Sequence, residues 1–155
     1  MLSPFVQRFA FLAAWLFVVA LVGCSNSSDP EDAVAQANAT NLRRLASLYF
    51  AYQSENNWHG PADEAQFKKF IQGVNPAKLN RVGIDPAKID EIFINERDGQ
   101  PFKIRYGVLG SVRGSTEPVV FEATGEGGNR MVGFLDMQQR EVDAAEYDRL
   151  LAGNK

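Results

Sequence analysis

The sequence has very few of the residues on which metal sites and nucleophilic active sites depend. Among 155 residues there is one cysteine, Cys24, and one histidine, His59. One cysteine forms no disulfide within the chain. One cysteine and one histidine are also too few for a metal site built from thiolates or imidazoles. A Ser-His-Asp triad has no support, because no nucleophile-elbow pattern is present. We therefore expect a non-enzymatic protein without cofactor, metal or catalytic residue. An enzyme would have to work with carboxylates alone.

Charge is almost absent from the first 28 residues, where Arg8 is the only charged side chain. It precedes an apolar run of 14 residues, Phe9 to Val22, that ends in small residues. A positive N-terminal region, an apolar core and a small-residue end form the pattern of a secretory signal peptide. The run is shorter than the roughly 20 residues of a transmembrane helix. The alternative is a retained anchor from Leu2 to Val22, with Arg8 at the membrane interface.

The run ends in Leu21, Val22, Gly23 and Cys24, which resemble, position by position, the lipobox of bacterial lipoproteins. The resemblance implies cleavage between Gly23 and Cys24, a diacylglyceryl group on the Cys24 sulfur, and acylation of the freed amine with a chain such as palmitate. Two or three long chains anchor a protein permanently, because each buried methylene contributes about 0.8 kcal/mol. Ser25, in place of Asp, implies sorting to the outer membrane, on its periplasmic side. The alternative is an ordinary secreted protein whose cysteine lies near the cleavage site by chance.

Cleavage at this point divides the chain into a signal peptide (1–23), a lipidated tether (24–29) and one domain (30–155). The mature chain has 132 residues, an ordinary size for a single domain. Loss of Arg8 takes the formal net charge from −3 to −4. A mildly acidic chain of mixed sign argues against nucleic acid as a partner. The expected partners are the membrane, through the lipid on Cys24, and an unknown protein of the envelope.

The N-terminal part of the domain predicts a long helix. Ser28 or Asp29 offers a cap and Pro30 a first helical residue, and no further glycine or proline occurs before Gly60, so we expect a helix over about 30–56. Its apolar stripe recurs at helical spacing and consists of Leu42, Leu45, Tyr49 and Tyr52. His59 lies in the turn that follows, where we expect it to pack without a chemical role.

Shorter helices are expected next. Pro61 should open a second helix, which a Glu64 and Lys68 pair supports and Gly73 closes. The similar stretches 75–79 and 85–89 each begin with Asn or Asp followed by proline. Each predicts a short helical turn, because Asn or Asp caps a helix and proline suits its first position.

The C-terminal part predicts an antiparallel sheet over about 92–142. Ile92 to Ile94 and the alternating stretch 102–108 predict a hairpin with one buried face, joined by Asp98-Gly99. Further strands, with a glycine-rich turn at 125–129, are expected at 119–123, 131–135 and 141–142.

A last helix is expected over about 143–152, where Asp143 and Glu146 fit a capping box and Gly153 follows. Helices come first along the chain, then an antiparallel meander, then this short helix. That order indicates the α+β class.

Two clusters deserve a chemical interpretation. Gly125 to Gly128 suggest a phosphate cradle, but the Lys-Ser/Thr pair of such loops is missing and a strand follows, so we interpret them as a hairpin turn. Asp90, Glu91 and Glu96 are close in sequence and could hold a cation. Their spacing matches no calcium loop, and we interpret them as a solvated surface.

The layout resembles pilin-like and type II secretion pseudopilin-like periplasmic domains. The resemblance covers most of 33–142 and depends on the long helix with Asn41 to Tyr52, on Gly127 to Arg130 and on Phe134 to Asp136. Pilins keep their apolar N-terminal helix and assemble through it. Here that segment is expected to be removed and replaced by lipid on Cys24, so the resemblance implies a shared fold without pilin-like assembly.

The leading hypothesis is a non-enzymatic, lipid-anchored protein of the cell envelope that acts as a structural or protein-interaction module. The alternative is a module for a small ligand or the cell wall, facing the periplasm, with Trp58, Tyr49 and Tyr106 as aromatic contacts. This alternative requires the three rings to be exposed together on one concave face.

Overall fold

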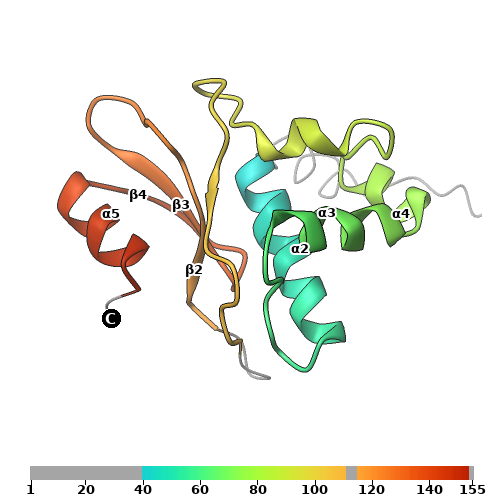
Figure 1. Cartoon of the computed structure of the whole chain (residues 1–155). Coiled ribbons are helices and arrows are strands. Elements are labelled where there is room, and N and C mark those ends of the chain that lie inside the picture. The colour runs from blue at the N-terminus through green and yellow to red at the C-terminus, as the bar shows by residue number, and fades with distance from the viewer. Residues whose placement is uncertain (1–39, 111–114, 154–155) are drawn as a thin grey trace, which may run out of the picture.

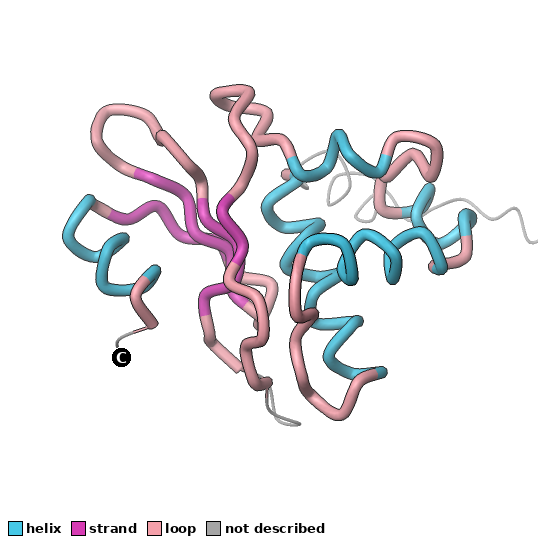
Figure 2. Tube along the Cα trace, in the orientation of Figure 1, coloured by secondary structure: helices cyan, strands magenta, loops and turns pink. Residues whose placement is uncertain are grey.

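A four-stranded antiparallel sheet forms the middle layer of the molecule, with helices on both sides (Figures 1 and 2). The computed structural model describes residues 40–110 and 115–153. In chain order the elements are α2 (Asn41–Glu55), α3 (Glu64–Gly73), α4 (Pro76–Arg81), the 3-10 helix η1 (Ile89–Phe93), β1 (Lys103–Ile104), β2 (Pro118–Phe121), β3 (Arg130–Phe134), β4 (Gln139–Val142) and α5 (Ala144–Leu151). The strands lie in sequence order, as a meander does, and the α+β class is therefore confirmed.

Helix α2 begins later than the sequence predicted. Thr40 is extended, with ψ at 158°, and its side chain accepts a hydrogen bond from the Arg43 amide, so Thr40 is a cap and not an interior residue. The expected helix over 30–56 is therefore wrong at Thr40, while residues 30–39 lie outside the described residues. The predicted end is confirmed, since α2 stops at Glu55. The predicted stripe is buried, because α2 packs against α3, η1, β2 and β3.

Helix α3 begins at Glu64 and not at Pro61. Asp63 is the cap, because its Oδ1 accepts from the Gln66 amide at 2.8 Å. Pro61 is held elsewhere: its carbonyl accepts from the Gly107 amide at 2.8 Å. The segment before α3 thus runs beside the chain that follows β1, and this tertiary contact excludes Pro61 from the helix.

The two proline-containing stretches differ in outcome. Asn75 caps α4 through its Oδ1, which accepts from the Ala77 amide at 2.8 Å, as predicted. Asp85 makes the same bond to the Ala87 amide at 2.9 Å, but only a turn follows, and then η1.

The predicted strand at 92–94 is wrong, and the sheet begins at Lys103 instead. Ile92 and Phe93 belong to η1, where they are buried against α2 and α3, and the Phe93 ring lies 5.8 Å from that of Phe67. Burial of consecutive apolar residues on the helical layer favours the 3-10 turn over an alternating strand. Ile94 retains one bridge to Pro101, which closes the predicted turn.

The inner strand β2 is buried on both faces, whereas β1 and β4 are partly exposed. All four residues of β2 are buried, because α2 packs on one side and α5 on the other (Figure 1). The Tyr147 ring of α5 lies edge-on to Phe121 at 5.6 Å. The predicted cap of α5 is confirmed, since Asp143 Oδ1 accepts from the Glu146 amide at 2.9 Å. Within the described residues, no helix has both the length and the apolar character to cross a membrane.

Candidate functional site

Two neighbouring hollows lie between α2 on one side and α3 and α4 on the other. Their volumes are about 580 Å³ and about 330 Å³, and Val74 and Lys78 line both. On α2 their combined lining extends from Arg43 to Asn56, which corresponds to about 20 Å of helix. We call the two hollows together the α2 furrow.

Local sequence creates the opposite wall of the α2 furrow. Helix α3 ends at Gly73, and Val74 is extended, with φ at −69° and ψ at 139°. Asn75 and Pro76 then start α4 at once. Because the chain leaves one helix and enters another within two residues, α3 and α4 both contribute side chains to the wall that faces α2.

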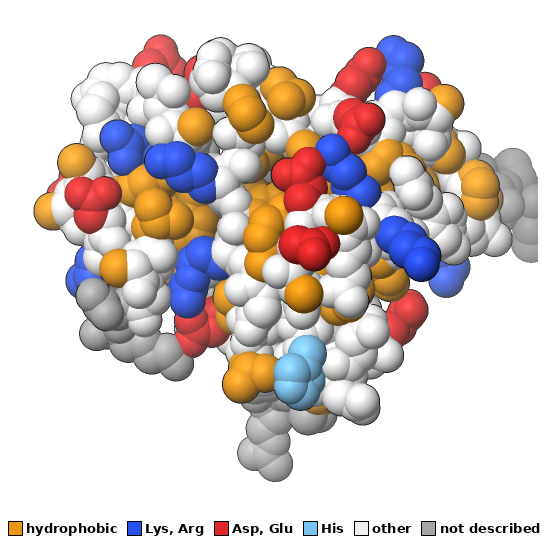
Figure 3. Space-filling model, in the orientation of Figure 1, with side chains coloured by type: hydrophobic (Ala, Val, Ile, Leu, Met, Phe, Trp, Pro, Cys, Tyr) orange, Lys and Arg blue, Asp and Glu red, His pale blue; other side chains and the backbone are white. Residues whose placement is uncertain are grey.

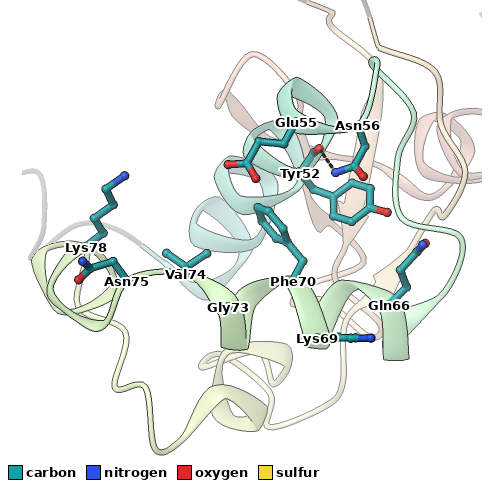
Figure 4. A pocket seen from close by; sticks show the side chains of 10 residues that line it. All are labelled: Tyr52, Glu55, Asn56, Gln66, Lys69, Phe70, Gly73, Val74, Asn75 and Lys78. Carbon is teal, nitrogen blue, oxygen red and sulfur yellow. Dashed lines mark hydrogen bonds between the residues drawn. The ribbon is translucent and has the colours of Figure 1, made fainter.

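The polar part of the furrow has aromatic rings at its base. The Tyr52 ring of α2 and the Phe70 ring of α3 lie close together (Figure 4), edge-on, with their centroids 5.1 Å apart. Asn56 Nδ2 donates to the Tyr52 carbonyl at 2.7 Å, and Gln66 Oε1 accepts from the Ala62 amide at 2.6 Å. These bonds leave the Asn56 Oδ1 acceptor and the Gln66 Nε2 donor for another molecule.

The other part is mainly apolar. Leu48, Leu79 and Val74 contribute to its lining, together with Val82 and Met137, each of which is 44% exposed. Met137 comes from the turn between β3 and β4, and its sulfur lies 3.9 Å from the Ser47 hydroxyl of α2. Its φ of 63° lies in the left-handed region, which side chains other than glycine adopt at a cost.

The lining of the furrow is positively charged although the chain is acidic. Among the described residues, the lining contains Arg43, Arg44, Lys69 and Lys78 and one carboxylate, Glu55, whereas the whole chain has 16 cations and 19 carboxylates. A cleft with charges of one sign concentrates its field. The furrow therefore favours a negatively charged ligand.

Three of these cations have no ion-pair partner within the described residues: Arg43, Lys69 and Lys78. Arg44 is held by the protein itself, 3.7 Å from Glu96 and donating to the Val82 carbonyl at 2.9 Å. The contrast with Lys68 is informative, since its ammonium lies 2.7 Å from both Glu64 and Asp90. Hydrogen bonds, first to Asp90 and then to Glu64, raise the pKa of Lys68.

The sequence-predicted lipidation and cleavage residues, Cys24 and Gly23, lie outside the described residues. The prediction that Tyr49 is an exposed aromatic contact is wrong, because its side chain is fully buried in the core. Trp58 is half-buried, with its ring 5.9 Å from that of Phe50, and Tyr106 is half-buried as well. The three rings therefore do not form one exposed face.

The charged and glycine-rich clusters have structural partners. Asp90 pairs with Lys68, while Glu91 pairs with Lys88 at 3.2 Å and Glu96 with Arg44. Gly125 to Asn129 form the turn between β2 and β3, as predicted, with a bridge between Glu126 and Asn129.

The single histidine lies at the surface, contrary to the expected packing role (Figure 3). His59 Nδ1 is 3.0 Å from the Asn57 carbonyl. Because a carbonyl only accepts, Nδ1 carries the proton in this contact.

Comparison with known proteins gave no match to any family model, curated protein or solved structure. Support for a role of the α2 furrow therefore comes from the chemistry of the residues that line it.

Sequence reasoning missed the furrow. Lys69, Lys78 and Val82 look like ordinary residues of short surface helices. Met137 carried the one usable signal, because an apolar residue between Asp136 and Gln138 is unusual in a tight turn.

Proposed function

We propose that this chain is a lipid-anchored protein of the bacterial cell envelope that acts as a non-enzymatic interaction module, with the α2 furrow as its binding surface. The single observation that supports the binding role is the lining of the furrow. It combines unpaired cations with the exposed apolar side chains of Val82 and Met137. An apolar centre with a charged and polar rim is the usual composition of a protein interface.

The anchor rests on the lipobox-like Leu21 to Cys24 after the apolar run, and Ser25 favours the outer membrane, facing the periplasm. Fifteen residues lie between Cys24 and Thr40, so Thr40 lies at most about 55 Å from the lipidated cysteine. The partner is therefore an envelope protein that comes close to the lipid surface. A pilin-like relationship belongs to the same proposal, without pilin-like assembly.

The lining favours binding over chemistry. It presents ammonium and guanidinium groups, amides, one phenol, the Ser47 hydroxyl and the Glu55 carboxylate, and no hydroxyl of the lining is hydrogen-bonded to a histidine or carboxylate among the described residues. A nucleophile needs such a base to be activated. The lysines and amides are better suited to hold a charged partner than to transform it.

The anchor is tested by mass spectrometry of the N-terminal peptide from the full-length protein and from Cys24→Ser, after membrane fractionation of a double-membrane bacterial host. We expect an acylated peptide that begins at Cys24 and is lost in the variant. An unmodified peptide with residues 9–22 still attached would overturn the anchor and favour a retained apolar helix.

The binding surface is tested by site-specific photo-crosslinking in the same host. A photoreactive amino acid replaces Ala51, which lines the furrow, or Ala145, which is exposed on α5 across the sheet. We expect a discrete protein adduct from position 51 and none from position 145. Adducts of equal yield from both positions, or an adduct with cell-wall material only, would reject the furrow as a protein-binding surface.

A further inference from the structure

We infer that the occupant of the α2 furrow is an acidic, amphipathic peptide segment of the partner protein. Its apolar side chains would cover Val82 and Met137, and its carboxylates would meet Lys78 and the cations on either side. This inference rests on the proposed interaction role and adds the chemistry of the partner to it.

The cations are spaced along the furrow and not gathered at one point. Arg43 lines only the apolar part, Lys69 only the polar part, and Lys78 both. Figure 4 shows Lys78 and Lys69 well separated on the α4 and α3 sides. A single lipid headgroup would use one of these positions. Carboxylates placed along a peptide match several of them, and charge complementarity of this kind directs specific association.

The apolar part is built from side chains that the fold itself does not need at the surface. The backbone of Met137 is in the left-handed region, and the residue is 44% exposed. Glycine would make the same turn without a backbone strain of about 1 kcal/mol. The retained thioether points toward α2 and adapts to varied apolar surfaces. Together with Val82 it offers contacts for the apolar side chains of an amphipathic segment.

The shape also favours a peptide over a membrane surface. The two hollows follow one another along about 20 Å of α2, a length that matches a segment of about four helical turns. A flat bilayer would contact the rims of such a furrow and leave its base empty. At the polar end, Asn56 and Gln66 offer an acceptor and a donor for the polar groups of a peptide.

The inference is tested with the full-length protein in a phosphatidylcholine nanodisc and a fluorescein-labelled peptide of about 14 residues. The peptide carries leucine at helical spacing and four flanking glutamates. One control peptide replaces the glutamates with lysine, and another replaces the leucines with serine. Fluorescence anisotropy should show binding at least about tenfold tighter for the acidic amphipathic peptide than for either control. Equal binding of the three peptides would overturn the inference.

Variants of one helix assign the binding to the furrow. Lys78→Glu should weaken binding of the acidic peptide by about tenfold or more. Arg81→Glu is the matched control, because it makes the same charge change at an exposed position of α4 outside the lining. It should change the affinity by less than about threefold. Equal losses in both variants would mean a diffuse charge effect and would overturn the inference.

Met137→Gly separates binding from folding, because the two readouts should move in opposite directions. Removing the left-handed strain should raise the midpoint of urea unfolding, while loss of the thioether should weaken peptide binding about threefold or more. Unchanged peptide binding would reject the inference that apolar side chains of the peptide cover Met137.

Competition with lipid vesicles shows whether the furrow binds a peptide or an anionic lipid. Displacement of the peptide by phosphatidylglycerol vesicles but not by phosphatidylcholine vesicles would identify an anionic lipid and overturn the inference. A crosslink from Ala51 without binding of the acidic peptide would keep the proposed function and reject only this partner chemistry.

Discussion

The hydroxyl of Tyr49 occupies the space beside Gly60 in which any larger residue would place its Cβ. That hydroxyl donates to the Arg105 carbonyl at 2.9 Å and accepts from the Val108 amide at 3.1 Å. The Gly60 amide in turn donates to the Val108 carbonyl at 2.9 Å. One phenol and one glycine thus fix the turn after α2 against the chain that follows β1, and so set the end of the helix that lines the furrow.

Gly60→Ala should destabilise the protein by about 1–3 kcal/mol, because the added methyl group displaces a phenol that two backbone bonds hold in place. Gly73→Ala is the matched control. A Cβ at Gly73 meets nothing within 4 Å, and alanine should be neutral or slightly stabilising at the end of α3. Urea unfolding followed by circular dichroism measures both variants, and equal stabilities would contradict the packing argument.

Stability should fall in alkaline solution. Burial raises the pKa of Tyr49 from 10.0 to about 12 and also raises the pKa values of Tyr106 and Tyr147. Above pH 10 the unfolded chain releases protons that the folded protein keeps. The free energy of unfolding is therefore unaffected below about pH 10 and decreases between about pH 10 and 12, by ~2 kcal/mol for Tyr49 alone.

Thermal unfolding at about pH 9 and about pH 11 measures this decrease, with Tyr49→Phe as the comparison. The variant is less stable at the lower pH, because the Val108 amide loses its acceptor, but its stability should change less between the two. If the wild-type protein had the same thermal midpoint at both pH values, the raised pKa of Tyr49 would be refuted.

Arg97→Ala should cost about 1–3 kcal/mol, because it leaves a buried carboxylate without its cation. The Glu122 side chain is 1% exposed and lies 3.4 Å from the Arg97 guanidinium, which also meets Glu126 and Glu141 at 3.2 and 3.5 Å. The exposed Lys88 provides the control, and Lys88→Ala should cost less than about 0.5 kcal/mol. Chemical denaturation of the two variants gives the comparison, and similar losses would show that burial of Glu122 does not matter.

Thr40→Ala tests where α2 begins. Thr40 caps the helix and its hydroxyl donates to Gln139 Oε1 at 3.0 Å, so its removal should destabilise the protein by about 1 kcal/mol. If the helix instead continued without a break to residue 30, alanine at this position would be favoured by about 0.5 kcal/mol. The sign of the change in the urea midpoint therefore decides between the two.

Much of the fold followed from interactions within a few residues. Asp143 and Asn75 cap their helices through an amide two or three residues ahead, and Glu64 pairs with Lys68 one helical turn away. The turns at 98–99 and 125–129 depend on glycines whose positive φ values the sequence already indicated. Such signals are complete within one element, and therefore the sequence alone placed α4, α5 and the strands β2, β3 and β4.

Tertiary structure decided the rest, because the deciding partners lie far apart in the chain. Ile92 and Phe93 form a helical turn because α2 and α3 bury them, and Pro61 stays outside α3 because Gly107 uses its carbonyl. The α2 furrow brings together side chains from α2, α4 and the β3–β4 turn. No local pattern states that Lys78 and Met137 share one surface, since only the packing of their elements places them there.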